Sequence, residues 1–166
     1  RPDFVTIAWV AFVGAFIWNG ASQAIRVGTI RGRLVRVPAS AVISAAVGAR
    51  ADHPIAEAVS ALDRFGRPAW LVALDAAGRP IGVVDPQALS AVPASRLATT
   101  NLGSVVVAQP ADWVVPVGPD ADLTTLVVPM QRAQLAVVAV VTADGLLAGV
   151  ATADAVNAAL SAPPPR

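Results

Sequence analysis

An internal repeat limits the folds open to this chain more than any other feature of its sequence. Residues 78–84 (GRPIGVV) align with residues 145–151 (GLLAGVA), a shift of 67 positions when 78 is subtracted from 145. The apolar run at 70–74 maps onto the run at 137–141 at the same spacing. Self-similarity at one constant spacing predicts two copies of a single supersecondary unit.

Each copy carries the pattern of a buried β-hairpin. Both apolar runs are continuous, as expected for strands that are covered on both faces. A turn follows each run, and Gly78 and Gly145 occupy the turn position at which a positive φ is needed. We therefore expect one tight hairpin in each copy.

Helices flank each predicted hairpin. Upstream, Asp52 and Asp120 stand where side chains would cap helices that begin near 54 and 123. Downstream, second helices are expected to begin at Pro86 and Ala153. Each copy thus reads strand, helix, strand, strand, helix.

The predicted fold class is α/β (α+β), in which an N-terminal transmembrane helix precedes two β-α-β-β-α units. We place the first repeat at 38–95, a linker at 96–103 and the second repeat at 104–160. Three successive prolines cannot continue a helix, so residues 161–166 are expected to form a disordered tail.

The transmembrane helix is predicted at residues 1–25, because no charged residue occurs from 4 to 25. About 20 apolar residues span the hydrocarbon layer of a membrane. A basic connector, 26–37, follows with Arg26, Arg31, Arg33 and Arg36, so the positive-inside rule predicts that the C-terminal part is cytoplasmic. A cleaved signal peptide and a buried helix of a soluble core are the alternatives, and the first lacks a basic segment before the apolar run.

Composition excludes several classes of function. The chain has no lysine, tyrosine or cysteine, which explains a pI near 9.2 at a formal net charge of +1. Arginine and aspartate alternate through the C-terminal part, so we expect no nucleic-acid partner. Absence of cysteine rules out disulfides and thiolate zinc sites.

No catalytic or metal-binding arrangement is recognisable. There is no G-x-S-x-G element, and the single histidine, His53, is interpreted as a solvated loop residue. The close carboxylates of Asp120 and Asp122 are better explained by helix capping than by metal binding or acid–base chemistry. Trp113 is expected to bury its area at a domain interface instead of contacting a ligand.

The chain resembles a pair of CBS domains. Two β-α-β-β-α units follow one another, and in each the hairpin ends in a G-V-V or G-V-A element before the second helix. The resemblance implies an adenosine ligand such as ATP, AMP or S-adenosylmethionine, bound by a hydroxyl side chain and an aspartate near the start of that helix. In the second copy Thr152 matches the hydroxyl position and Asp154 lies one residue early; in the first copy Asp85 and Ala88 replace both groups. The candidate adenosine-site residues are therefore Thr152, Asp154 and Asp85.

The order of apolar helix, arginine-rich connector and CBS pair also resembles the C-terminal end of an actinobacterial member of the site-2 protease family. That resemblance implies an intramembrane protease whose zinc is held by an H-E-x-x-H motif outside this sequence, while this segment is not an enzyme. We expect a regulatory tail in the cell membrane that forms a homodimer through the CBS pair. The alternative is a regulatory or structural CBS tail of a transporter or channel, without a ligand.

Overall fold

The computed structural model describes residues 37–161. The predicted transmembrane helix at 1–25, nearly all of the connector and the tail after Ser161 lie outside these residues. Within 37–161, no helix has both the length and the apolar character that crossing a membrane requires.

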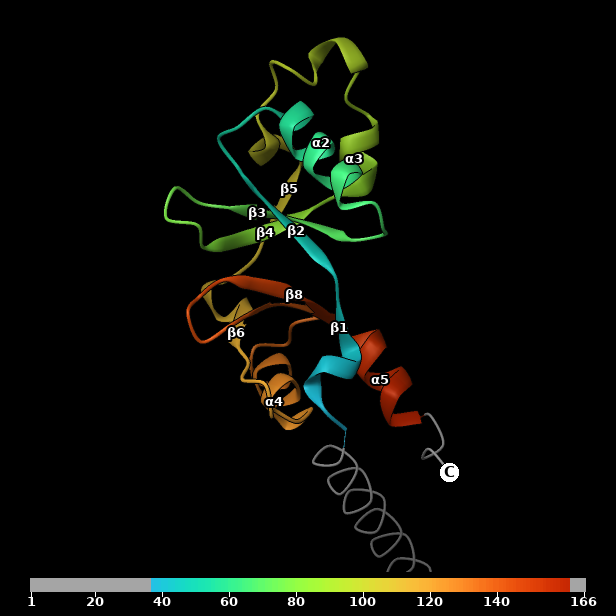
Figure 1. Ribbon diagram of the computed structural model, residues 1–166, viewed down its shortest axis with the longest axis vertical. Helices are drawn as coiled ribbons and strands as arrows, with labels where there is room; N and C mark the ends of the chain where they lie inside the picture. Colours follow the sequence, from blue (N-terminus) through green and yellow to red (C-terminus); the bar gives the residue numbers. More distant parts are fainter. Residues whose placement is uncertain (1–36, 162–166) are drawn as a thin grey trace, which may run out of the picture.

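Two four-stranded sheets, each covered by two helices, make up the described fold (Figure 1). The first module has the strand order β2-β3-β4-β5, in which only the β2–β3 pair is parallel. Its elements are β2 (Ala46–Arg50), α2 (Ile55–Phe65), β3 (Trp70–Leu74), β4 (Pro80–Val84), α3 (Pro86–Ser90) and β5 (Val106–Ala108).

The second module repeats this architecture with the strand order β1-β8-β7-β6, and its parallel pair is β6–β7. Its elements are β1 (Ile43–Ser44), β6 (Val114–Pro116), α4 (Thr124–Arg132), β7 (Val137–Val141), β8 (Leu147–Thr152) and α5 (Ala153–Ser161). Short 3-10 helices occur in the connecting segments at Ala39–Val42 (η1), Ala94–Arg96 (η2), Leu102–Val105 (η3) and Ala111–Trp113 (η4).

The two sheets face each other at the centre of the molecule, and the helices lie on the outer sides (Figure 1). Alternate residues of β3 serve the two faces: Val72 packs between the sheets, while Leu71 and Ala73 pack beneath the helices of the first module. In β7, Ala139 likewise lies between the sheets. Both strands are therefore buried on both faces, as their continuous apolar runs predicted.

The predicted hairpins are confirmed. β3 and β4 pair antiparallel, as do β7 and β8. Gly78 and Gly145 adopt φ values of 80° and 79°, in the region where a residue with a Cβ is strained. The helices predicted after the hairpins are also present, as α3 and α5.

The predicted caps of the upstream helices are wrong in detail. Pro54 stands at the N-cap of α2, while Asp52 pairs with Arg50 instead. Backbone carbonyls from the linker satisfy the first N–H groups of α2: Ile55 donates to Thr100 O at 2.9 Å and Ala56 to Leu97 O at 3.0 Å. Tertiary contact thus replaces the local cap that the sequence suggested.

At α4 the capping carboxylate comes from Asp122. Its Oδ1 accepts a hydrogen bond from the Thr124 N–H at 2.9 Å. Asp120, the predicted cap, lies in the turn before it. The capping role predicted for this acidic pair therefore holds for Asp122.

The boundaries between the repeats also differ from the prediction, because the modules exchange edge strands. β1, placed in the first repeat by sequence, pairs with β8 of the second module. β5, placed in the second repeat, pairs with β4 of the first module. Leu102 and Val105 belong to the core of the first module, so the predicted boundary at 103–104 falls inside it. Apolar pattern marks a strand but does not say which sheet it joins.

The glycines of the repeated G-V-V and G-V-A elements lie where these exchanged strands cross. A Cβ at Gly82 would meet the Val107 carbonyl oxygen of β5. A Cβ at Gly149 would lie 2.5 Å from the Ser44 carbonyl oxygen of β1. Neither glycine has a positive φ. Close approach of the exchanged strand, and not backbone conformation, therefore accounts for both.

Candidate functional site

Two clefts occupy equivalent places in the two modules. Cleft 1, in the first module, has a volume of about 520 Å³. It lies where the β1–β2 connection, the start of β3, the end of β4 and α3 meet, and is lined by Ser44, Ala45, Leu62, Pro68, Ala69, Trp70, Leu71, Val84, Pro86 and Leu89. None of these ten side chains is charged.

Cleft 2, in the second module, is smaller, at about 250 Å³. It is lined by Val127, Met130, Gln131, Gln134, Leu135, Ala153, Val156 and Asn157. Three of these positions, Leu135, Ala153 and Val156, correspond to Pro68, Pro86 and Leu89 of cleft 1 after the shift found in the sequence. The repeat has therefore produced two related clefts that differ in their lining.

Thr152 and Asp154 lie together at the start of α5, beside cleft 2. The Thr152 Oγ1 accepts a hydrogen bond from the Ala155 N–H at 3.2 Å, so this hydroxyl caps the helix. Asp154 is exposed in the first turn. Ala153, between them, lines the cleft. Thr152 and Asp154 are therefore neighbours in sequence of a lining residue, and neither of them lines cleft 2 itself.

Asp85, the third predicted site residue, belongs to the other module. Its Oδ1 accepts a hydrogen bond from the Gln87 N–H at 2.8 Å and caps α3. It lies between Val84 and Pro86, both of which line cleft 1. The three predicted residues therefore adjoin lining residues of two different clefts in sequence, and their roles in ligand binding stay predictions.

Cleft 1 itself was not foreseen in the sequence. Ser44 and Ala45 reach it because the chain crosses there from one sheet to the other, which no local pattern reveals. Trp70 is a sequence feature that could have indicated cleft 1, because it is an aromatic residue at the start of an apolar strand. In the structure it remains 37% exposed. A large aromatic surface left open beside a cleft is typical of ligand contact.

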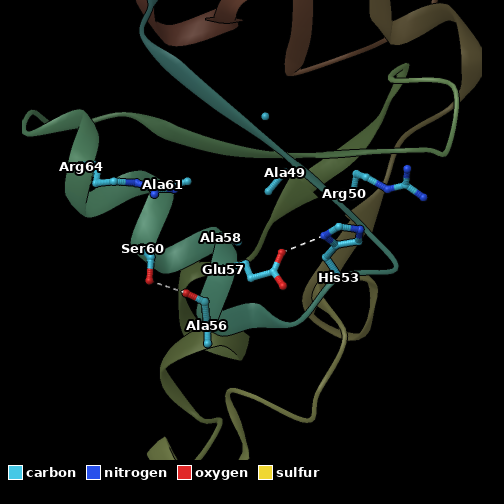
Figure 2. Close-up of a pocket in the computed structure, with 10 residues that line it drawn as sticks. Ala49, Arg50, His53, Ala56, Glu57, Ala58, Ser60, Ala61 and Arg64 are labelled. Atoms are coloured by element: carbon cyan, nitrogen blue, oxygen red, sulfur yellow. Dashed lines mark hydrogen bonds and ion pairs between the residues drawn. The ribbon is translucent and has the colours of Figure 1, made fainter.

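A third, polar groove runs between α2 and β2, with a volume of about 460 Å³ (Figure 2). The His53 Nδ1 lies 2.8 Å from the Glu57 Oε2, and Arg50 pairs with Asp52 at 2.7 Å. The Arg50 guanidinium lowers the pKa of the Asp52 carboxyl group to about 2. His53 is exposed, as predicted for a loop residue, although it is paired with Glu57. Most of the charge in this groove is thus matched internally.

Metal chemistry receives no support from residues 37–161, where no group of three or more histidine, aspartate or glutamate side chains is placed to hold an ion. The zinc implied by the protease resemblance stays a prediction. The described chain provides no ligand set for it.

Trp113 lies between the sheets, as predicted for an interface residue. It is 1% exposed and packs with Val72 and Val83 of the first module and Ala139 and Val150 of the second. Its role is to join the modules and not to line either cleft.

These features define the class: the described chain has the fold of a pair of CBS domains. No protein-family model matches the sequence, and no curated protein matches it significantly. The chain is similar to solved structures at less than 25% sequence identity, and this similarity establishes the fold alone.

One such structure is the CBS domain of a CBS domain-containing membrane protein from Sphaerobacter thermophilus, at 18% identity and a TM-score of 0.54, covering 83% of this chain and 96% of that one. Another is the CBS domain of a bacterial CNNM/CorC family Mg²⁺ transporter in complex with ATP, at 17% identity and a TM-score of 0.53, with the same coverage. A third is a CBS domain-containing protein of unknown function from Kribbella flavida, at 24% identity and a TM-score of 0.51. The match covers 74% of this chain and 95% of that one.

None of these three is described as a protease. Other similar structures are longer than the present chain. It spans 58% of protein MJ1004 from Methanocaldococcus jannaschii and 44% of the cytosolic domain of the Mg²⁺ channel MgtE.

Proposed function

We propose that this chain is a non-catalytic regulatory module that binds a small ligand in its clefts and transmits the binding to its N-terminal segment. The observation that carries the proposal is the pair of equivalent clefts, one in each module. A ligand shifts a conformational equilibrium only by its differential affinity for two arrangements. Clefts built from several elements of a packed pair provide such a difference.

For cleft 2 we propose an adenosine nucleotide, ATP or AMP, or S-adenosylmethionine. The nine-residue helix α5 begins at its rim, and helix N-termini favour anions. The exposed Asp154 carboxylate is suited to accept hydrogen bonds from ribose hydroxyls. The solved CBS domain of the CNNM/CorC transporter with bound ATP is a precedent in another protein of this fold.

We expect η1 to transmit ligand binding from the second module to the N-terminal segment. Ala39 donates a hydrogen bond to Ala121 O at 2.8 Å, and Leu123 donates to Val37 O at 3.1 Å. Ala39 and Val42 also belong to the core cluster that contains Val156 of α5. A ligand that displaces α5 would therefore move the segment that leads to the basic connector.

We further propose that the module faces the cytoplasm, forms a homodimer and regulates a membrane protein. The support is the uncharged, largely apolar stretch at 4–25, which is followed by arginines. A site-2-type zinc protease is one proposed parent, on sequence resemblance alone. A transporter or channel is the other, and it is favoured by the CNNM/CorC family Mg²⁺ transporter, whose CBS domain shares the fold.

Isothermal titration calorimetry on the full chain tests the ligand. ATP, AMP and S-adenosylmethionine are titrated into the wild-type protein and into the variants Asp154→Ala and Asp144→Ala. Asp144→Ala is the matched control, because Asp144 is an exposed aspartate in the hairpin turn of the same module. Binding that Asp154→Ala abolishes and Asp144→Ala retains is expected. Absence of heat for all three compounds at millimolar concentration eliminates the sensing function, and analytical ultracentrifugation tests the dimer separately.

A further inference from the structure

We propose that the polar groove between α2 and β2 is a binding site for a short zwitterionic peptide of two or three residues. Arg64 binds the carboxylate end of this peptide and Glu57 binds its ammonium end; both side chains line the groove. The inference goes beyond the proposed function, because it concerns a third site with a ligand class of its own. It depends on neither cleft 1 nor cleft 2.

One cationic side chain of the groove is left without a partner. Arg50 is held by Asp52, which accepts hydrogen bonds from the Arg50 Nε at 3.0 Å and Nη2 at 2.7 Å. Arg64 lines the groove as well, but within residues 37–161 it has no ion pair and no side-chain hydrogen bond. A free guanidinium group is suited to bind a carboxylate, because its planar N–H groups match the two carboxylate oxygens.

The Glu57 carboxylate supplies the opposite charge. The His53 Nδ1 lies 2.8 Å from Glu57 Oε2, and an ionised carboxylate can accept further hydrogen bonds on its other oxygen. In the described part of the chain no ion pair joins Glu57 to Arg64. A ligand with a single charge would be attracted by one of these two groups and repelled by the other. The groove therefore favours a ligand that carries both charges.

The spacing of the two residues indicates the length of the ligand. Glu57 and Arg64 are seven positions apart on the same helix, α2 (Figure 2), which is about 10 Å along the axis at a rise of about 1.5 Å per residue. An extended peptide covers about 3.3–3.6 Å per residue, so two or three residues span about 7–11 Å. The groove volume of about 460 Å³ lies within the range of about 300–1,000 Å³ that is usual for small-molecule sites.

The opposite wall of the groove favours a peptide over other zwitterions. β2 is an outer strand of its sheet and pairs only with β3. Gly48, in the middle of β2, lines the groove, so this part of the wall is backbone. An open strand edge presents N–H and C=O groups with which an extended peptide can pair. Five of the ten lining residues are glycine or alanine, which leaves space for a peptide with small side chains.

NMR titration of the ¹⁵N-labelled full chain tests the assignment. Dialanine and trialanine are added, beside N-acetyl-dialanine and dialanine amide, each of which lacks one terminal charge. We expect saturable shifts of the Gly48 and Ala49 amide signals with at least one free peptide, while the signal of Gly118 in the second module stays. Each blocked peptide should bind at least about tenfold more weakly than dialanine.

Two variants assign the two charges separately. Arg64→Gln should reduce the difference between dialanine and its amide to within about twofold, and Glu57→Gln should do the same for the acetylated peptide. Both substituted positions are exposed, so both variants should fold. Asp63→Asn and Arg79→Gln are the matched controls, because both side chains are exposed in the same module and neither lines the groove.

The inference is overturned if no free peptide moves the Gly48 and Ala49 signals at millimolar concentration, if the blocked peptides bind as tightly as the free ones, or if either variant leaves its preference unaltered. Acetate or methylammonium that binds as tightly as dialanine would show charge attraction only, and would also overturn it. Calorimetric binding that depends on Asp154, found with a silent groove, would remove this inference and leave the proposed function standing. A responsive groove without Asp154-dependent binding would do the reverse.

Discussion

The indole Nε1 of Trp113 donates a hydrogen bond to the carbonyl oxygen of Pro80 at 3.1 Å, across the interface between the two sheets. The two residues are 33 positions apart and belong to η4 and β4. A buried N–H group that lacked this acceptor would carry a desolvation cost. The bond therefore fixes how the second module docks on the hairpin of the first.

Replacement of Trp113 should weaken the docking of the two modules. Trp113→Phe leaves the Pro80 carbonyl without its donor and should cost about 1–3 kcal/mol in the free energy of unfolding. Trp113→Ala adds a cavity and should cost about 3–5 kcal/mol. Urea unfolding measures both; Trp70→Phe, at a partly exposed ring, is the control, and equal losses for Trp70→Phe and Trp113→Phe would contradict this role.

Gly149→Ala should displace the exchanged strand β1. The added Cβ would lie 2.5 Å from the Ser44 carbonyl oxygen, a backbone atom that cannot rotate away. We expect a loss of about 1–3 kcal/mol in stability by urea unfolding. Gly118→Ala is the matched control, because its Cβ would meet no atom within 4 Å, and a change within about 0.5 kcal/mol is expected there.

The Arg50–Asp52 pair should respond to acid. The folded-state pKa of Asp52 is lowered from 3.8 to about 2, mainly by the hydrogen bond from Arg50. Because the folded pKa is depressed, the favourable contribution of the pair is complete above pH 4 or so and is lost as pH falls toward 2. NMR titration of the Asp52 carboxyl group checks this, and Arg50→Gln should return its pKa close to 3.8. An unchanged Asp52 pKa in that variant would show another cause.

The segment between the repeats should resist hydrogen exchange. The Leu102 N–H donates to His53 O at 2.9 Å, and the Gly103 N–H donates to Ala51 O at 2.8 Å. With the two bonds to α2, these tie the linker to the first module. Amide exchange monitored by NMR should show Leu102 and Gly103 protected like the strands. Rapid exchange at both would mean that the linker opens independently.

Asp85→Ala should loosen α3. The variant removes the acceptor of the Gln87 N–H, and loss of such a cap costs about 1 kcal/mol. We expect faster exchange of the Gln87 amide, while Asp85→Asn keeps it slow. The comparison of the two variants therefore isolates the capping role of Asp85.

Sequence reasoning succeeded where a feature is local. The hairpins could be predicted because Gly78 and Gly145 mark positive φ and because the flanking runs are continuously apolar. It failed at Asp52, where a cap was expected on local grounds but the linker carbonyls of Leu97 and Thr100 accept instead. For the candidate site, it selected residues that are adjacent in sequence to lining residues of the two clefts, and their roles in ligand binding stay predictions.

The sequence by itself determined the repeat, its hairpins and the helices after them, because turn conformation and apolar period depend on neighbours along the chain. Only the tertiary structure decided that β1 pairs with β8 of the second module and β5 with β4 of the first. The sheet that an edge strand joins depends on hydrogen-bond partners far away in sequence. The exchange also brings Ser44 to Trp70 and so creates cleft 1.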